Sequence, residues 1–110
     1  HLSTGMRTKL AIVLGLSGRP QIVVMDEPTS GLDPASQEWV WAVVDDQTRQ
    51  GRMGFLVSSH SREEVVDHCT RVVVLDEGRI RERLDLAAPR STNLVRLRAA
   101  MGGAGESYAD

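Results

Sequence analysis

Cysteine, lysine, aromatic side chains and long apolar runs are all scarce in this sequence. The single cysteine, Cys69, excludes an internal disulfide and suits a reducing compartment. The longest unbroken apolar run is residues 39–44, far shorter than the roughly 20 residues that a membrane helix requires. Lys9 is the only lysine among 13 basic residues. We therefore expect a chain without a transmembrane segment of its own, which reaches a membrane only through a partner.

The rest of the composition is that of an ordinary globular domain. The chain of 110 residues is 41% hydrophobic and 25% charged, and its net charge is -2. This charge gives no electrostatic reason to expect a nucleic acid partner. The first residue, His1, lies directly before a motif-bearing segment, so we expect the chain to be a piece of a longer domain.

Short β-branched runs alternate with helical patterns along the chain. The runs are apolar at every position, which predicts strands that are buried on both faces. Such an alternation predicts the α/β class, with a mainly parallel sheet, flanking helices and a C-terminal β-hairpin. The expected apolar strands are residues 22–25, 55–57 and 72–75, and residues 79–84 are expected to form an alternating strand that pairs back as the hairpin. The expected helices are residues 6–16, a segment from the cap Asp33 to near Gly51, and a short helix opened by Ser61.

Two of the expected strands end in an Asp-Glu pair. An apolar strand that delivers two carboxylates suits a metal-phosphate site, where one holds Mg²⁺ and the other polarises a water molecule. The more usual fate of such a pair is two solvated acids, so the local pattern does not decide. Asp76 and Glu77 run into a Gly-Arg hairpin turn, whereas Asp26 and Glu27 run into a Pro-Thr-Ser-Gly loop and a helix cap. We predict that Asp26 and Glu27 form the site.

Three segments together resemble the motifs of ABC ATPases in order and spacing. They are residues 2–6 (LSTGM), 26–34 (DEPTSGLDP) and 58–60 (SSH). They match the family's signature, its Walker B motif with the D-loop, and its switch histidine. The resemblance covers residues 1 to about 84, and the sequences of the motifs are most similar to those of the ATPases of drug and antibiotic exporters. It implies the C-terminal part of a P-loop NTPase domain over residues 1–84, a weakly helical extension over 85–100 and a disordered tail over 101–110.

The resemblance also implies roles for individual side chains around ATP and Mg²⁺. In this family two nucleotide-binding domains enclose two ATP molecules. Asp26 would then serve the metal, Glu27 would orient or activate the hydrolytic water, and His60 would contact the γ-phosphate. Ser3 and Gly5, at the amino-terminal end of a helix that favours anions, would face the ATP of the opposite domain. Asp33 would lie at the interface between the two domains, and it also suits a helix cap.

The sequence departs from the family pattern in two ways. Thr4 stands where a glycine is commonest, and Met6 stands where a glutamine is commonest, so hydrolysis is expected to be slow or asymmetric. No Gly-x-x-x-x-Gly-Lys-[Ser/Thr] loop occurs, because Lys9 is flanked by Thr8 and Leu10 within a helix. We therefore expect these 110 residues to be inactive alone.

The predicted function is the ATP-hydrolysing subunit of an ABC transporter that powers export of a small molecule. Its expected partners are a second nucleotide-binding domain and a transmembrane permease, with no nucleic acid. Its expected location is the inner face of the cell membrane, held there by the permease. Two alternatives are a non-transport ABC ATPase that acts on ribosomes or DNA, and a truncated product without enzymatic activity. The Asn-His-Leu-Asp run common in the ribosome- and DNA-associated relatives is not found here.

Overall fold

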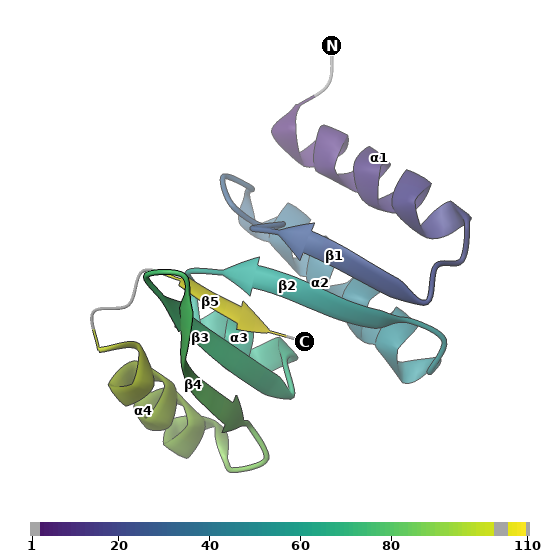
Figure 1. The fold of residues 1–110 in the computed structure, drawn as a ribbon. Coiled ribbons are helices and arrows are strands. Elements are labelled where there is room, and N and C mark those ends of the chain that lie inside the picture. Colours follow the sequence, from purple (N-terminus) through teal and green to yellow (C-terminus); the bar gives the residue numbers. More distant parts are fainter. Residues whose placement is uncertain (1–2, 103–105, 110) are drawn as a thin grey trace. The chain divides into compact units, whose positions relative to one another are not determined.

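Helices and strands alternate along the chain in the computed structural model (Figure 1), which describes residues 3–102 and 106–109. The α/β class that the sequence predicts is therefore confirmed. In chain order the elements are α1 (Thr4–Ser17), β1 (Ile22–Asp26), α2 (Pro34–Arg49), β2 (Gly54–Ser59), α3 (Arg62–His68), β3 (Arg71–Asp76), β4 (Arg79–Asp85), α4 (Arg90–Met101) and β5 (Glu106–Ala109). Contacts divide them into two units, His1–Phe55 and Leu56–Asp110.

The first unit is built from α1, β1, α2 and the beginning of β2. Both long helices start at side-chain caps, Ser3 for α1 and Asp33 for α2, and Pro34 occupies the first turn of α2. A backbone hydrogen bond of 2.8 Å, from Gly54 N to Gln21 O, ties the start of β2 to the residue before β1. Buried apolar side chains come from every element of this unit. They are Ile12, Met25, Leu32, Val40, Trp41, Val44 and Phe55.

Within these 110 residues one face of β1 is exposed, so the predicted burial of β1 on both faces is not met in this part of the protein. Ile22 and Val24 are 72% and 71% exposed, whereas Met25 is only 9% exposed. Side chains alternate between the faces of a strand, so residues 22, 24 and 26 share the open face. Asp26 therefore leaves the end of β1 on its solvent-facing side.

The second unit contains a sheet in which β5 lies between β2 and β3, and β4 forms the far edge (Figure 1). All three pairings are antiparallel, so β2 and β3 run in the same direction. The predicted C-terminal hairpin is confirmed as β3 and β4. Its turn residues Glu77 and Gly78 both have positive φ, 50° and 75°, as a type I′ hairpin turn requires.

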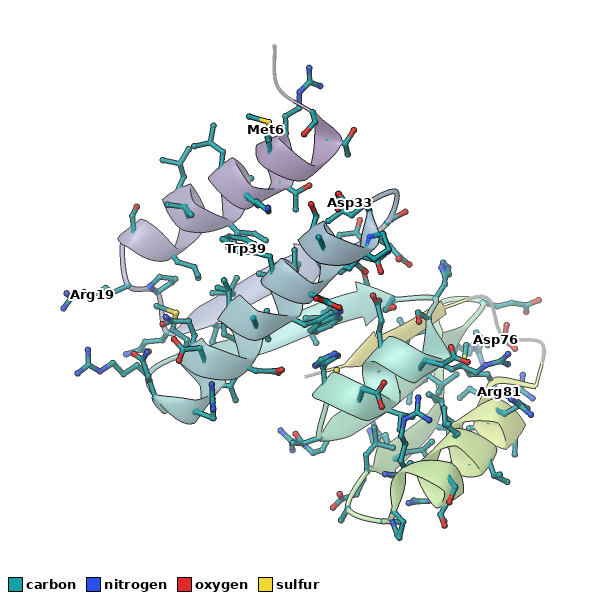
Figure 2. The ribbon with its side chains drawn as sticks, turned by 180° about the vertical axis from the view of Figure 1, so that it is seen from behind. Met6, Arg19, Asp33, Trp39, Asp76 and Arg81 are labelled. Atoms are coloured by element: carbon teal, nitrogen blue, oxygen red, sulfur yellow. The ribbon has the colours of Figure 1, made fainter. Side chains whose placement is uncertain are left out.

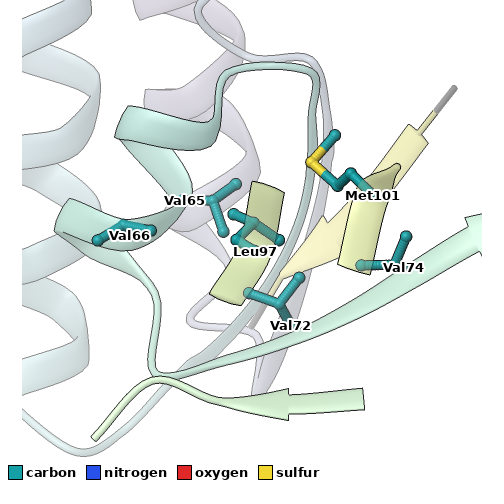
Figure 3. Close-up of a cluster of buried hydrophobic side chains, with 6 residues drawn as sticks. All are labelled: Val65, Val66, Val72, Val74, Leu97 and Met101. Carbon is teal, nitrogen blue, oxygen red and sulfur yellow. The ribbon is translucent and has the colours of Figure 1, made fainter. Parts of the chain in front are cut away.

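Helices α3 and α4 supply the core of the second unit together with β3 (Figure 3). Six buried side chains form one cluster: Val65, Val66, Val72, Val74, Leu97 and Met101. Asn93, also buried, fixes the start of α4 because its Nδ2 donates to Leu86 O at 3.1 Å and to Ala88 O at 2.7 Å. Burial of each large apolar side chain stabilises a fold by about 1.5–3 kcal/mol, so this cluster is the main anchor of the unit.

The C-terminal region differs from its prediction in part. The weak helix expected within residues 85–100 is present as α4, which ends at Met101. Disorder was expected over residues 101–110, but residues 106–109 form β5. Residues 103–105 and 110 lie outside the described residues. The physical reason for β5 is non-local, because β2 and β3 both offer backbone groups that a strand between them can pair with.

Candidate functional site

The amino-terminal end of α1 carries the signature residues of the first unit. Ser3 caps the helix, since its Oγ accepts a hydrogen bond of 3.1 Å from the Met6 backbone N–H. Gly5 in the first turn is buried, and Met6 is 51% exposed. The amide groups of a first helical turn and the helix dipole together favour an anion. Ser3 and Gly5 therefore stand where the sequence predicts them, at a helix end suited to a phosphate group.

Asp26 and Glu27 end β1 and begin a loop that tight turns hold in shape. Glu27 has a φ of 46°, in the left-handed region that non-glycine residues seldom occupy. Its carbonyl accepts a 3.1 Å hydrogen bond from Ser30 N, and the Thr29 carbonyl accepts one of 3.2 Å from Leu32 N. These turns fix the direction in which the backbone leaves the strand.

A cavity of about 350 Å³ opens between α1 and β1 in this same unit. One side of α1, residues 23–26 of β1 and three loop residues (Glu27, Pro28 and Ser30) line it. Both residues of the pair therefore border a cavity whose α1 side is mostly apolar. A magnesium ion typically takes one or two protein carboxylates and fills its remaining positions with water and phosphate oxygens.

The described residues hold no group of three or more His, Cys, Asp or Glu side chains that could bind a metal ion. A metal held by protein ligands alone is thus a poor fit for residues 3–102 and 106–109. The donor set that is present, a carboxylate pair at a strand end, fits a hydrated Mg²⁺ that is held mainly by nucleotide phosphates.

Asp33 caps α2 and is held by the helix that it caps. Its Oδ2 accepts a hydrogen bond of 3.2 Å from Ser36 N, and Gln37 N donates to its backbone carbonyl at 3.0 Å. The Ser36 hydroxyl, then the Ser36 N–H, and to a smaller extent the charge of Lys9, lower the pKa of Asp33. This carboxylate stays ionised at neutral pH.

Two contacts in the first unit join α1 to α2. The Lys9 ammonium lies 5.7 Å from the centre of the Trp39 ring, a cation–π distance. Closer to the helix ends, Gly5 lies against Ser36 and Asp33: a Cβ at position 5 would be 2.7 Å from Ser36 Oγ. The structure therefore brings together Gly5 and Asp33, two of the predicted site residues, and adds Ser36. The sequence signal for Ser36 is its place three residues after a capping aspartate.

His60 belongs to the second unit, where it directly follows β2. Ser61 N donates to Ser59 Oγ at 3.0 Å, so a local turn spans His60 and fixes its backbone. Ser61 also caps α3, because its Oγ accepts from Glu64 N at 3.3 Å, as predicted. Ser58 and Ser59 are buried, whereas His60 is exposed at the carboxyl end of the strand.

Comparison with known proteins shows a consistent relationship. The chain is 38% identical over 80 residues to human ATP-binding cassette sub-family A member 9, and 40% identical over 79 residues to mouse sub-family A member 7. These matches cover 73% and 72% of the chain. It is also 33% identical over 111 aligned positions, covering 87% of the chain, to the energy-coupling factor transporter ATP-binding protein EcfA2 of Acetivibrio thermocellus. No family model matches.

The chain belongs to the ATP-binding cassette (ABC) ATPase family. It spans 40% of the length of the A. thermocellus relative, and 5% and 4% of the human and mouse relatives. The family assignment confirms the resemblance to ABC ATPases that the sequence carries. Among the described residues of this ABC ATPase, no helix is both long enough and apolar enough to cross a membrane.

Proposed function

We propose that these residues form the hydrolytic part of the ATP-binding subunit of an ABC transporter, which powers export of a small molecule. The observation that carries the proposal is the Asp26-Glu27 pair, fixed by turns at the end of β1 and bordering a cavity beside α1. The family of the chain supports it. The sequence of residues 26–34 supports an assignment to the group of drug and antibiotic exporters.

In this proposal the chain's carboxylates handle a metal-bound phosphate and a water molecule. Asp26, on the open face of β1, would provide one oxygen ligand to Mg²⁺, which when bound offsets phosphate charge. Glu27 would accept a hydrogen bond from the attacking water and so orient or activate it, a role that typically contributes about 10²–10⁴-fold in rate. His60 would contact the γ-phosphate through its exposed ring.

The remaining site residues would act on the ATP of a second nucleotide-binding domain. The amide groups behind Ser3 and Gly5 would face its γ-phosphate, because a helix amino terminus favours anions. The ionised carboxylate of Asp33 would lie at the interface between the domains. A transmembrane permease would be the other partner and would hold the subunit at the inner face of the membrane.

Calorimetry with ATP and Mg²⁺ tests how far these 110 residues act alone. No Gly-x-x-x-x-Gly-Lys-[Ser/Thr] run occurs in them, so we expect no appreciable ATP binding by the chain alone. The complete gene product that contains these residues should bind and hydrolyse ATP and copurify with a protein that has several apolar spans of ~20 residues. A micromolar dissociation constant for the 110 residues would contradict the first expectation. Copurification with ribosomes would favour a non-transport ATPase.

A further inference from the structure

The first turn of α1 lies close to α2 at Gly5. A methyl group there would lie 2.7 Å from Ser36 Oγ, and 3.4 Å from both Ser36 Cβ and Asp33 Oδ1. The first distance is shorter than a van der Waals contact, so Ser36 would have to move to admit a larger residue, whereas the other two are ordinary contacts. The hydroxyl of Ser36 is thus the atom that sets how close the helices come.

Ser36 bonds to Asp33 and packs against Gly5. Only 7% of its surface is exposed, although it lies in the first turn of a helix. Its N–H donates to Asp33 Oδ2 at 3.2 Å, and its hydroxyl is the largest cause that lowers the pKa of that carboxylate. Farther along the helices, the contact of Lys9 with Trp39 holds α1 and α2 together at a second point.

We propose that Ser36 is a positioning residue that holds the signature turn of α1 and the carboxylate of Asp33 together as one rigid group. A shift of the α1 amino terminus would then displace Ser36, and Ser36 would turn the carboxylate that accepts the hydrogen bond from its N–H. This role rests on the proposed function. Ser36 would couple the two sites of one domain, because an anion bound at the α1 terminus would change the orientation of Asp33 in the same domain.

Thermal unfolding of single and double variants of the 110-residue chain tests the packing of Gly5 against Ser36. Gly5→Ala should lower Tm by about 10 °C, since overpacking by one methyl group is felt strongly in a close-packed site. Adding Ser36→Ala removes the oxygen at 2.7 Å and leaves contacts of 3.4 Å, so the double variant should recover most of that loss. Gly15→Ala is the matched control on the same helix, because nothing lies within 4 Å of its added methyl, and it should not lower Tm.

ATP hydrolysis by the complete gene product tests the positioning role. Ser36→Ala should lower kcat about three- to tenfold, the worth of one hydrogen bond, and leave KM for ATP within about twofold. Gly5→Ala should lower kcat further, and the double variant should return to the Ser36→Ala level. Unchanged kcat in Ser36→Ala would overturn the proposal, as would a Gly5→Ala defect that Ser36→Ala does not relieve. If the unmutated product hydrolyses no ATP, the proposed function fails, while the Tm comparison still decides the packing.

Discussion

Two strands of this molecule end in an aspartate followed by a glutamate, and the backbone conformation of the glutamate is nearly the same in both pairs. Glu27 and Glu77 both take a left-handed φ, 46° and 50°. The surroundings differ. Asp76 forms an ion pair of 3.4 Å with Arg81 across the hairpin (Figure 2), whereas Asp26 and Glu27 border the cavity beside α1.

The difference teaches that neither an Asp-Glu pair nor a strained backbone identifies a catalytic site. Left-handed φ at Glu77 is explained by the two-residue turn that joins β3 to β4. Strain at Glu27 belongs to a longer loop that leads into the cap of α2. What distinguishes the first pair is the cavity beside it and the loop after it. The second pair therefore serves as an internal control for the first.

The largest expected effect separates the two glutamates. In the complete gene product, Glu27→Gln should slow ATP hydrolysis by roughly 10²-fold or more, because an amide cannot accept a proton from water, and should leave ATP binding largely intact. Glu77→Gln should leave the rate within about twofold. Steady-state phosphate release measures both. Equal rates in the two variants would remove Glu27 from its proposed role.

A smaller effect is expected from the two aspartates. Asp26→Asn should raise the Mg²⁺ concentration for half-maximal hydrolysis by about tenfold, since a charged oxygen ligand is lost. Asp76→Asn should leave the Mg²⁺ dependence unchanged and cost at most about 1 kcal/mol of stability, as its ion pair with Arg81 is solvent-exposed. Magnesium titrations and urea unfolding check the two expectations, and a shifted titration in Asp76→Asn would contradict the distinction.

The smallest effect concerns the second pair. Asparagine adopts the left-handed region more readily than glutamate, so Glu77→Asn should raise the free energy of unfolding by about 0.5–1 kcal/mol. Urea denaturation of the 110 residues measures this quantity. A lower free energy of unfolding for Glu77→Asn would contradict the expectation.

Local features of this fold could be predicted from sequence. The caps Asp33 and Ser61 are confirmed by hydrogen bonds of 3.2 Å and 3.3 Å, because capping depends on residues three positions apart. The strand over residues 22–25 and the hairpin after Leu75 are present within one or two residues of their expected ends. The roles of the six predicted site residues remain predictions.

Non-local features could not be predicted. The exposure of Ile22 and Val24 within these 110 residues could not be predicted, because both residues have the composition of a buried strand and the other elements of a fold determine which face is covered. The strand β5 was missed because a Gly-, Ala- and Ser-containing segment has little strand propensity of its own. Ser36 was missed because its contact with Gly5 joins residues from two helices that the sequence separates by 31 positions.

The register of β5 has a consequence for the order of folding. Val57 is opposite Ala109 in the sheet, and Val72 is opposite the same residue from the other side. The pairing of Val57 with Ala109 closes a long loop, and closing it is entropically costly and slow relative to forming the local hairpin of β3 and β4. On the ribosome, the hairpin can therefore form early, whereas the pairings of β5 with β2 and β3 require that translation has passed Ala109.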